Sequence, residues 1–182
     1  RNWLWDETEQ RLRIIDFVTP WLRDFKLRPP FSPYREFAMP DYPVHVQFPV
    51  RLVFVGFGSI GQGVLPLVLR HIGIKPERIT IVTADESGKR EAEEYGIKFV
   101  VNPLTRDNYR QVLDPLIGRG DFLLNLSVDV SSIALVKFAY EKGALYLDTC
   151  IEPWPGGYTD PSISPSRRTN YALREEALAL RE

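Results

Sequence analysis

A glycine-rich turn between a strand-like run and a helix-like stretch constrains the fold most strongly. Residues 56–61 read GFGSIG, follow the largely apolar run of residues 50–55, and open a helix-like stretch. In such a turn Gly56 permits the tight bend, Gly58 lets the backbone approach a pyrophosphate, and Gly61 lets the helix pack closely on the strand. The N–H groups at the start of the helix would then face the phosphates. The predicted cofactor-binding residues of this turn are Gly56, Gly58, Ser59, Ile60 and Gly61.

An acidic residue follows the next strand-like run at a suitable distance. Asp85 comes after residues 79–83 and lies 24 residues beyond Gly61, near the usual spacing of about 20. A carboxylate there would accept hydrogen bonds from the adenosine ribose hydroxyls and repel a 2′-phosphate, which favours NAD over NADP. The nearby Lys89 and Arg90 moderate this preference. The alternative is that the glycines only make a tight turn and that Asp85 is a solvated loop residue.

Strand-like and helix-like stretches alternate from residue 50 to the end of the chain. Near-continuous apolar strands alternating with helices are typical of a parallel sheet covered on both faces. We therefore predict the α/β class, with a doubly wound, Rossmann-like parallel sheet. Thr105 and Asp129 are the expected helix N-caps, and Gly118 and Gly143 are the expected helix ends. The strands are expected at residues 50–55, 79–83, 97–101, 122–126 and 144–147, and the helices at residues 60–71, 88–95, 106–117, 131–142 and 166–181.

The N-terminal segment differs from the rest in composition. Residues 1–49 hold 7 of the 15 prolines and 10 of the 22 aromatic residues. Ile14 and Leu22 belong to an apolar set with approximately helical spacing, which Pro20 interrupts. We predict an irregular, Pro- and aromatic-rich segment, extended or partly helical. It is expected either to dock as an amphipathic arm or to be packed loosely or disordered. The predicted division is a leader over 1–48, a dinucleotide-binding domain over 49–150, and a connection with a first helix toward a substrate domain over 151–182.

Polar side chains follow two later strand-like runs, at the edge where a doubly wound sheet presents its ligand-binding groups. Asn125 and Ser127 could bind the nicotinamide ribose or carboxamide, or could merely cap the strand. In the next such segment a cationic ligand would pair with the carboxylates of Asp148 or Glu152 and with the π-face of Trp154. The alternative for that segment is an ordinary Pro/Gly-rich connection. The predicted substrate-binding residues are Asp148, Glu152 and Trp154.

Charge, cysteine count and motifs argue against several function classes. The 23 Lys and Arg against 24 Asp and Glu show no bias toward nucleic acid or an anionic membrane. No run approaches about 18 clean apolar residues, so no membrane span is expected. Cys150 is the single cysteine, which favours a reducing compartment and a cytoplasmic location. His45 and His71 are the only histidines and no H-E-x-x-H or C-x-x-C motif is present, so no metal site is expected.

Several segments together closely resemble bacterial homospermidine synthase, which carries a saccharopine-dehydrogenase-like NAD-binding domain. The similarity extends from about Met39 to the C-terminus, and we expect Met39 to be the native start. Members of that family continue into a second domain, so the chain is expected to be truncated. The segments that carry the resemblance are residues 56–67 (GFGSIGQGVLPL), 125–129 (NLSVD), 148–154 (DTCIEPW) and 166–175 (SRRTNYALRE).

The resemblance implies an NAD-dependent aminoalkyl transfer. NAD takes a hydride from the carbon beside an amine of putrescine, a second putrescine displaces ammonia from the resulting imine, and the returned hydride gives homospermidine and regenerates NAD. Gly56, Gly58, Gly61 and Asp85 would hold the adenosine half of the cofactor. Glu152 would act in catalysis by steering a cationic amine, and a homodimer is suggested. The residues implied along the nicotinamide half are Asn125, Leu126, Ser127 and Thr149.

Two other functions are compatible with these residues. One is a non-catalytic module for NAD binding or oligomerisation. The other is a saccharopine-dehydrogenase-like oxidoreductase, which shares the nucleotide-binding fold and a reductive amine chemistry.

Overall fold

The computed structural model describes residues 2–6, 11–15 and 42–181, which fall into two units, Arg1–Pro40 and Asp41–Glu182. In the first unit β1 (Asn2–Asp6) and β2 (Arg11–Ile15) pair in antiparallel fashion. Ile14 therefore lies in a strand, where its spacing indicated a helix, because pairing with β1 requires extended backbone. Met39, which is the expected native start, lies outside the described residues. So do the other residues of the predicted leader up to residue 41 that belong to neither β1 nor β2.

The second unit is built on a five-stranded sheet whose order is β7-β6-β4-β8-β9. Each neighbouring pair is parallel, and the first strand of the glycine motif, β4, lies in the centre. This order reverses direction at β4, so ligand-binding groups are expected at the carboxyl ends of β4 and β8. The predicted Rossmann-like sheet is confirmed. The strands are β4 (Leu52–Val55), β6 (Ile79–Thr83), β7 (Lys98–Val101), β8 (Phe122–Asn125) and β9 (Leu145–Asp148).

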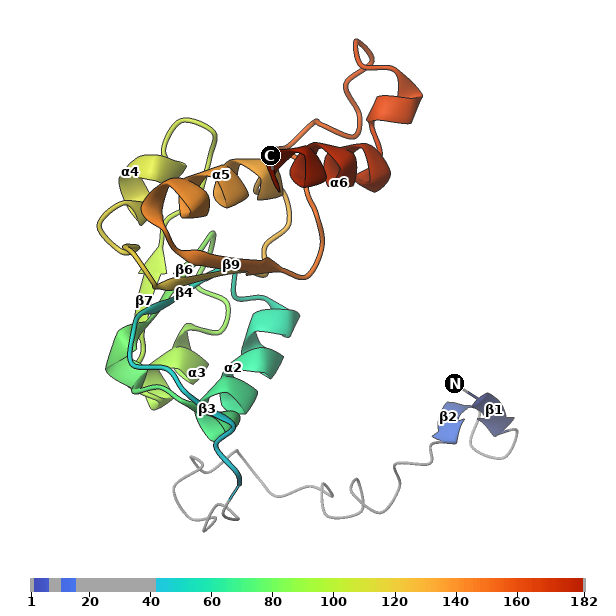
Figure 1. Cartoon of the computed structure of the whole chain (residues 1–182). Coiled ribbons are helices and arrows are strands. Elements are labelled where there is room, and N and C mark those ends of the chain that lie inside the picture. Colours follow the sequence, from blue (N-terminus) through green and yellow to red (C-terminus); the bar gives the residue numbers. More distant parts are fainter. Residues whose placement is uncertain (1, 7–10, 16–41, 182) are drawn as a thin grey trace. The chain divides into compact units, whose positions relative to one another are not determined.

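Helices cover both faces of the sheet. Figure 1 shows α2 and α3 on one face, α4 and α5 on the other, and α6 beside α5. A short parallel pair, β3 (Val46–Gln47) with β5 (Ile72–Gly73), joins the segment before the sheet to the end of α2. The helices are α2 (Ser59–His71), α3 (Lys89–Glu94), α4 (Tyr109–Leu113), α5 (Ser132–Lys142) and α6 (Asn170–Leu178), with 3-10 turns at Pro76–Arg78, Pro165–Arg167 and Ala179–Arg181.

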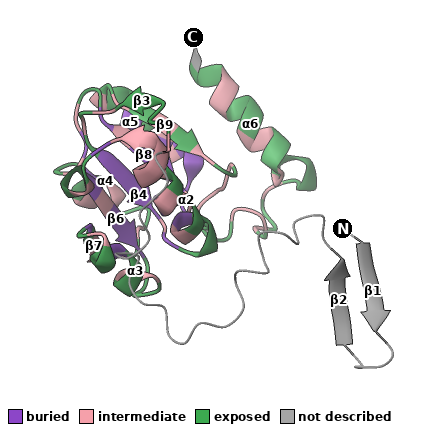
Figure 2. Cartoon of the chain, turned by 90° about the horizontal axis from the view of Figure 1, so that it is seen from below, coloured by how far each residue is buried: buried purple, intermediate pink, exposed green. Residues whose placement is uncertain are grey.

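The core consists of two apolar layers separated by the sheet. Alternate residues of β4 face opposite sides, so Phe54 joins the layer under α2 while Val53 and Val55 join the layer under α5. Figure 2 shows the central strands as the most deeply buried part of this unit. Burial on both faces explains why these strands are continuously apolar in the sequence.

Several helix boundaries differ from the sequence-based expectation. The N-cap of α5 is Ser131, whose hydroxyl accepts the N–H of Ala134 at 3.3 Å, and not Asp129. Asp129 instead takes a left-handed conformation with φ 60°, which places it in the turn before the helix. The helix α4 begins at Tyr109, later than expected, with Asn108 and not Thr105 as its N-cap. It ends at Leu113, before the expected end at Gly118. The helix α6 begins at Asn170, also later than expected. Gly143 ends α5 with φ 65°, as predicted.

A buried carboxylate fastens the start of the central strand to β8. Asp121 accepts hydrogen bonds from the backbone N–H of Arg51 at 2.9 Å, from the Arg51 Nε at 2.8 Å and from the N–H of Gly118 at 2.8 Å. These bonds hold the amino ends of the strands together. Among the described residues, no helix is long and apolar enough to cross a membrane.

Candidate functional site

The glycine turn at the end of β4 has three different environments for its three motif glycines. Gly56 adopts φ +85°, and a Cβ built there would lie 2.7 Å from the Cα of Ser127. A Cβ on Gly61 would lie 2.9 Å from the ring of Phe57, so this glycine allows the helix to approach the strand. A Cβ on Gly58 would meet no atom within 4 Å. Gly58 therefore borders open space, as a backbone that receives a phosphate must.

The helix α2 begins directly after Gly58, the glycine that borders open space. Gly58 is the N-cap, no side chain caps the helix, and its first turn contains no acidic residue. The N–H of Gln62 makes the bond to the carbonyl of Gly58 at 3.0 Å. The N–H groups before Gln62 have no intrahelical acceptor, and Ser59 and Ile60 are exposed. An anion at this end would meet these N–H groups and the positive end of the helix dipole.

The loop after β6 holds Asp85 at the surface, beside the glycine turn. Its Oδ1 accepts the N–H of Ser87 at 2.8 Å, which gives the loop a local turn. The amide of Gln62 donates to the carbonyl of Phe57 at 3.0 Å and lies 3.5 Å from the Ser87 hydroxyl. These contacts join the Asp85 loop to the turn that opens α2.

The two cations near Asp85 are held by neighbouring glutamates. Lys89 pairs with Glu86 at 3.0 Å, and this hydrogen bond raises the pKa of the Lys89 ammonium. Arg90 pairs with Glu94 at 3.1 Å on the same helix, α3. Both pairs are exposed, so they are weak. Neither cation pairs with Asp85, however. Among the contacts of the described residues, the Asp85 carboxylate has no cationic partner.

At the end of β8, the polar groups bond to one another. Asn125 is 1% exposed and its Oδ1 accepts from the hydroxyl of Ser127 at 2.6 Å and from the Ser127 N–H at 3.2 Å. Ser127 in turn lies against Gly56. The structure therefore brings the predicted residues Asn125 and Ser127 to the glycine turn. The partly buried Leu126 continues the sheet here through a bond from its N–H to the carbonyl of Val55 at 2.8 Å.

Tyr146 on β9 completes this group, and the sequence-based prediction missed it. Its hydroxyl donates to Asp148 Oδ2 at 3.0 Å and accepts from Asn125 Nδ2 at 3.3 Å. Burial, and then the charge of Asp148, raise the pKa of the Tyr146 hydroxyl well above its usual value. A signal was available, because Tyr146 and Asp148 are two residues apart in a strand and so share a face.

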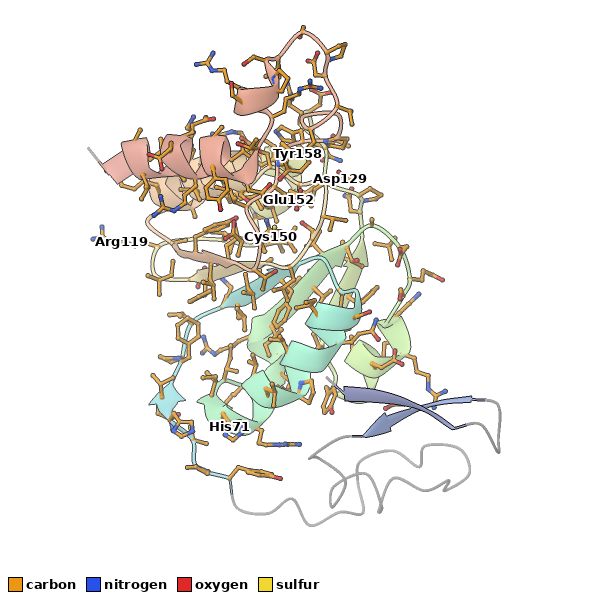
Figure 3. The ribbon with its side chains drawn as sticks, turned by 90° about the vertical axis from the view of Figure 1, so that its right-hand side faces the viewer. His71, Arg119, Asp129, Cys150, Glu152 and Tyr158 are labelled. Carbon is orange, nitrogen blue, oxygen red and sulfur yellow. The ribbon has the colours of Figure 1, made fainter. Side chains whose placement is uncertain are left out.

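The segment after β9 carries a second polar cluster, shown in Figure 3 between the end of that strand and α6. The Cys150 thiol lies 3.3 Å from Glu152 Oε1, and this hydrogen bond raises the pKa of the thiol. Tyr158 donates its hydroxyl proton to one of two acceptors, the carbonyl of Ile151 at 3.1 Å or Asn170 Oδ1 at 2.8 Å. The predicted catalytic residue Glu152 thus lies among groups from both the connection and α6.

The start of α5 holds that segment in place. The backbone N–H of Glu152 donates to the Ser132 hydroxyl at 2.9 Å, and its carbonyl accepts the N–H of Ser132 at 2.8 Å. Thr149 is exposed beside this segment. Trp154 packs against Tyr109 with ring centroids 5.6 Å apart and lines the core layer under α5. This packing gives Trp154 a structural role, and its substrate contact stays a prediction.

Within residues 42–181, no group of His, Cys, Asp and Glu side chains is arranged to hold a metal ion. A surface depression lies elsewhere, along the β7 edge, where Val100, Asn108 and Leu116 are among the residues that line it. It contains none of the predicted site residues. The candidate site is therefore the carboxyl edge formed by the glycine turn, the Asp85 loop and the ends of β8 and β9.

Comparison with known proteins identifies similar chains. Residues 52–182 match the family model described as the Saccharopine dehydrogenase NADP binding domain. A homospermidine synthase from Blastochloris viridis is 44% identical over 146 residues, and one from Mesorhizobium japonicum is 40% identical over 141 residues. The matches cover 79% and 76% of this chain but 31% and 29% of those relatives. The chain thus spans less than a third of the length of the curated relatives it matches.

A solved structure is similar in both sequence and fold. The crystal structure of a homospermidine synthase from Legionella pneumophila, in complex with NAD, is 38% identical and superposes with a TM-score of 0.65. The similarity covers 74% of this chain and 27% of that one.

Proposed function

Because the chain belongs to the family of the Saccharopine dehydrogenase NADP binding domain, we propose that it is the NAD-binding part of a homospermidine synthase-like enzyme. The observation that carries the proposal is the glycine turn. Gly56 is pressed against Ser127, while Gly58 borders open space at the N-terminus of α2. This is the environment that a pyrophosphate requires.

The charges around Asp85 support NAD as the cofactor in preference to NADP. An exposed carboxylate at this strand end accepts from ribose hydroxyls and repels a 2′-phosphate. Lys89 and Arg90 could attract that phosphate, but each is paired with a glutamate. The solved relative from Legionella pneumophila contains NAD, which agrees with this choice.

The chemistry that NAD supplies when bound is reversible acceptance of a hydride. The chain's own residues would bind and orient the reactants. The N-terminus of α2 would hold the pyrophosphate, and Ser127, with Asn125 behind it, would lie along the nicotinamide half, next to Leu126 and Thr149. Asp148 and Glu152 would attract a cationic amine such as putrescine, because carboxylates stabilise ammonium and iminium charge in a partly dehydrated site.

A test of the proposal separates binding from turnover. We expect NAD to bind to the chain in a calorimetric titration. Incubation with putrescine and NAD, followed by analysis for homospermidine and ammonia, then tests the reaction. Homospermidine would support the enzyme, whereas NAD binding without product would favour the alternative of a binding module. Failure to bind NAD would contradict both.

The homodimer and the cytoplasmic location remain predictions, the first from the family resemblance and the second from the single cysteine.

A further inference from the structure

A line of hydrogen bonds connects the ends of β9 and β8 to the glycine turn. It runs from Asp148 through the Tyr146 hydroxyl and the Asn125 amide to Ser127, with heavy-atom distances of 3.0, 3.3 and 2.6 Å. Ser127 then touches Gly56, since a Cβ on that glycine would lie within 3 Å of its backbone. We call these four polar side chains the strand-end relay.

The relay has a single direction of proton donation. A carboxylate only accepts, so the Tyr146 hydroxyl must donate to Asp148 and can only accept from Asn125. The amide nitrogen of Asn125 therefore faces Tyr146, and its oxygen faces Ser127. The backbone N–H of Ser127 agrees with this orientation from the other side of the amide, because an N–H can only donate to the oxygen, at 3.2 Å.

This direction determines what the two ends of the relay offer to a ligand. The Ser127 hydroxyl uses its proton on Asn125, so it retains only lone pairs. Asp148 has its second oxygen, Oδ1, outside the bond to Tyr146. Both ends therefore present acceptors, and they suit a ligand group that donates hydrogen bonds, such as a ribose hydroxyl, a carboxamide NH₂ or an ammonium.

The environment of Tyr146 keeps its hydroxyl protonated. Most of the side chain is buried against the core layer under α5. Burial and the negative charge of Asp148 raise its pKa, although hydrogen bonds from Asn125 and Ser132 oppose that shift. Because the phenol does not ionise in the physiological range, its hydroxyl always donates to Asp148 and accepts from the Asn125 amide.

We propose that Tyr146 is a positioning residue that sets the direction of the strand-end relay, so that Ser127 and Asp148 present only acceptors to the nicotinamide half of the cofactor. This rests on the proposed function for the identity of the ligand. Tyr146 itself touches neither cofactor nor substrate in this account. Its contribution is to hold the nitrogen side of the Asn125 amide, while the Ser127 N–H holds the oxygen side.

The test compares NAD with ADP, which lacks the nicotinamide half, in calorimetric titrations of the whole chain. Tyr146→Phe removes the hydroxyl and keeps the ring. We expect its Kd for NAD to rise about tenfold, as loss of one or two hydrogen bonds between the relay and the nicotinamide half implies. Its Kd for ADP should stay within about twofold. The matched control is Tyr140→Phe on α5, whose side chain is 83% exposed, and it should change neither value.

A second variant keeps the proposal testable if Tyr146→Phe does not fold. Asp148→Asn preserves shape but removes the acceptor-only group, so it should weaken NAD binding and spare ADP binding. Equal weakening of NAD and ADP would show a merely structural role and overturn the inference, as would wild-type NAD affinity in the folded variants. Absence of NAD binding by the wild-type chain would instead overturn the proposed function. In that case the Asn125 side-chain amide signals in NMR spectra still test the relay, which is refuted if Tyr146→Phe leaves them unchanged.

Discussion

The contact between Gly56 and Ser127 makes the glycine turn sensitive to a single methyl group. Gly56→Ala places a Cβ 2.7 Å from the Ser127 Cα and 2.8 Å from its backbone nitrogen, at a φ of +85°. Left-handed backbone at a non-glycine residue costs about 1–3 kcal/mol. Overpacking against atoms that cannot move cheaply adds about 1–3 kcal/mol. We therefore expect the free energy of unfolding to fall by about 2–6 kcal/mol.

A matched control separates the two contributions. Gly120 has φ +81°, but a Cβ there would meet no atom within 4 Å. Gly120→Ala should therefore lose only the conformational part, about 1–3 kcal/mol. Urea denaturation followed by circular dichroism measures both variants. Gly56→Ala must be the less stable by about 1–3 kcal/mol, and equal losses would refute the close contact with Ser127.

Three further predictions concern the carboxylates. Asp121→Ala removes the acceptor of two backbone N–H groups and a guanidinium, so the free energy of unfolding measured by urea denaturation should fall by about 2–4 kcal/mol. The matched control, Asp114→Ala at an exposed position, should lower it by no more than about 1 kcal/mol. Similar losses in the two variants would contradict the role of Asp121 in fastening the strands. Glu152→Gln removes the negative charge, and weakens the hydrogen bond, that raise the pKa of the Cys150 thiol. Alkylation by iodoacetamide at pH 8 should therefore become faster, and a rate–pH profile with an unchanged midpoint would argue against this coupling. Asp85→Ser should weaken NAD binding and narrow the preference for NAD over NADP, and an unaltered ratio of the two Kd values would count against Asp85 as the ribose acceptor.

The parallel sheet could be predicted because its signal is local. The three inner strands β4, β6 and β8 are largely buried on both faces and read as nearly continuous apolar runs, and the glycine turn follows β4 directly. The start of α5 was less predictable. Asp129 and Ser131 are both good N-cap residues, and the selection depends on the left-handed turn that Asp129 adopts.

The partners of the site residues could not be predicted, since they depend on register. Asn125 and Asp148 are paired positions of neighbouring strands, which places Tyr146 between their side chains. The sequence separates these residues by more than twenty positions. Trp154 likewise met the pattern of a ligand-facing aromatic residue, and its contact with Tyr109 arises only when α4 is placed over the sheet.

The central claim is that the open side of the glycine turn receives the pyrophosphate of NAD. Gly58 has φ −74° and open space around its Cβ position, so Gly58→Ala should leave the free energy of unfolding within about 1 kcal/mol of wild type. Calorimetric titration of NAD into both proteins is the most direct test. We expect the wild-type chain to bind NAD and the added methyl group to raise the Kd at least about tenfold, a loss of about 1.4 kcal/mol. A folded Gly58→Ala chain that binds NAD as tightly as wild type would contradict the claim.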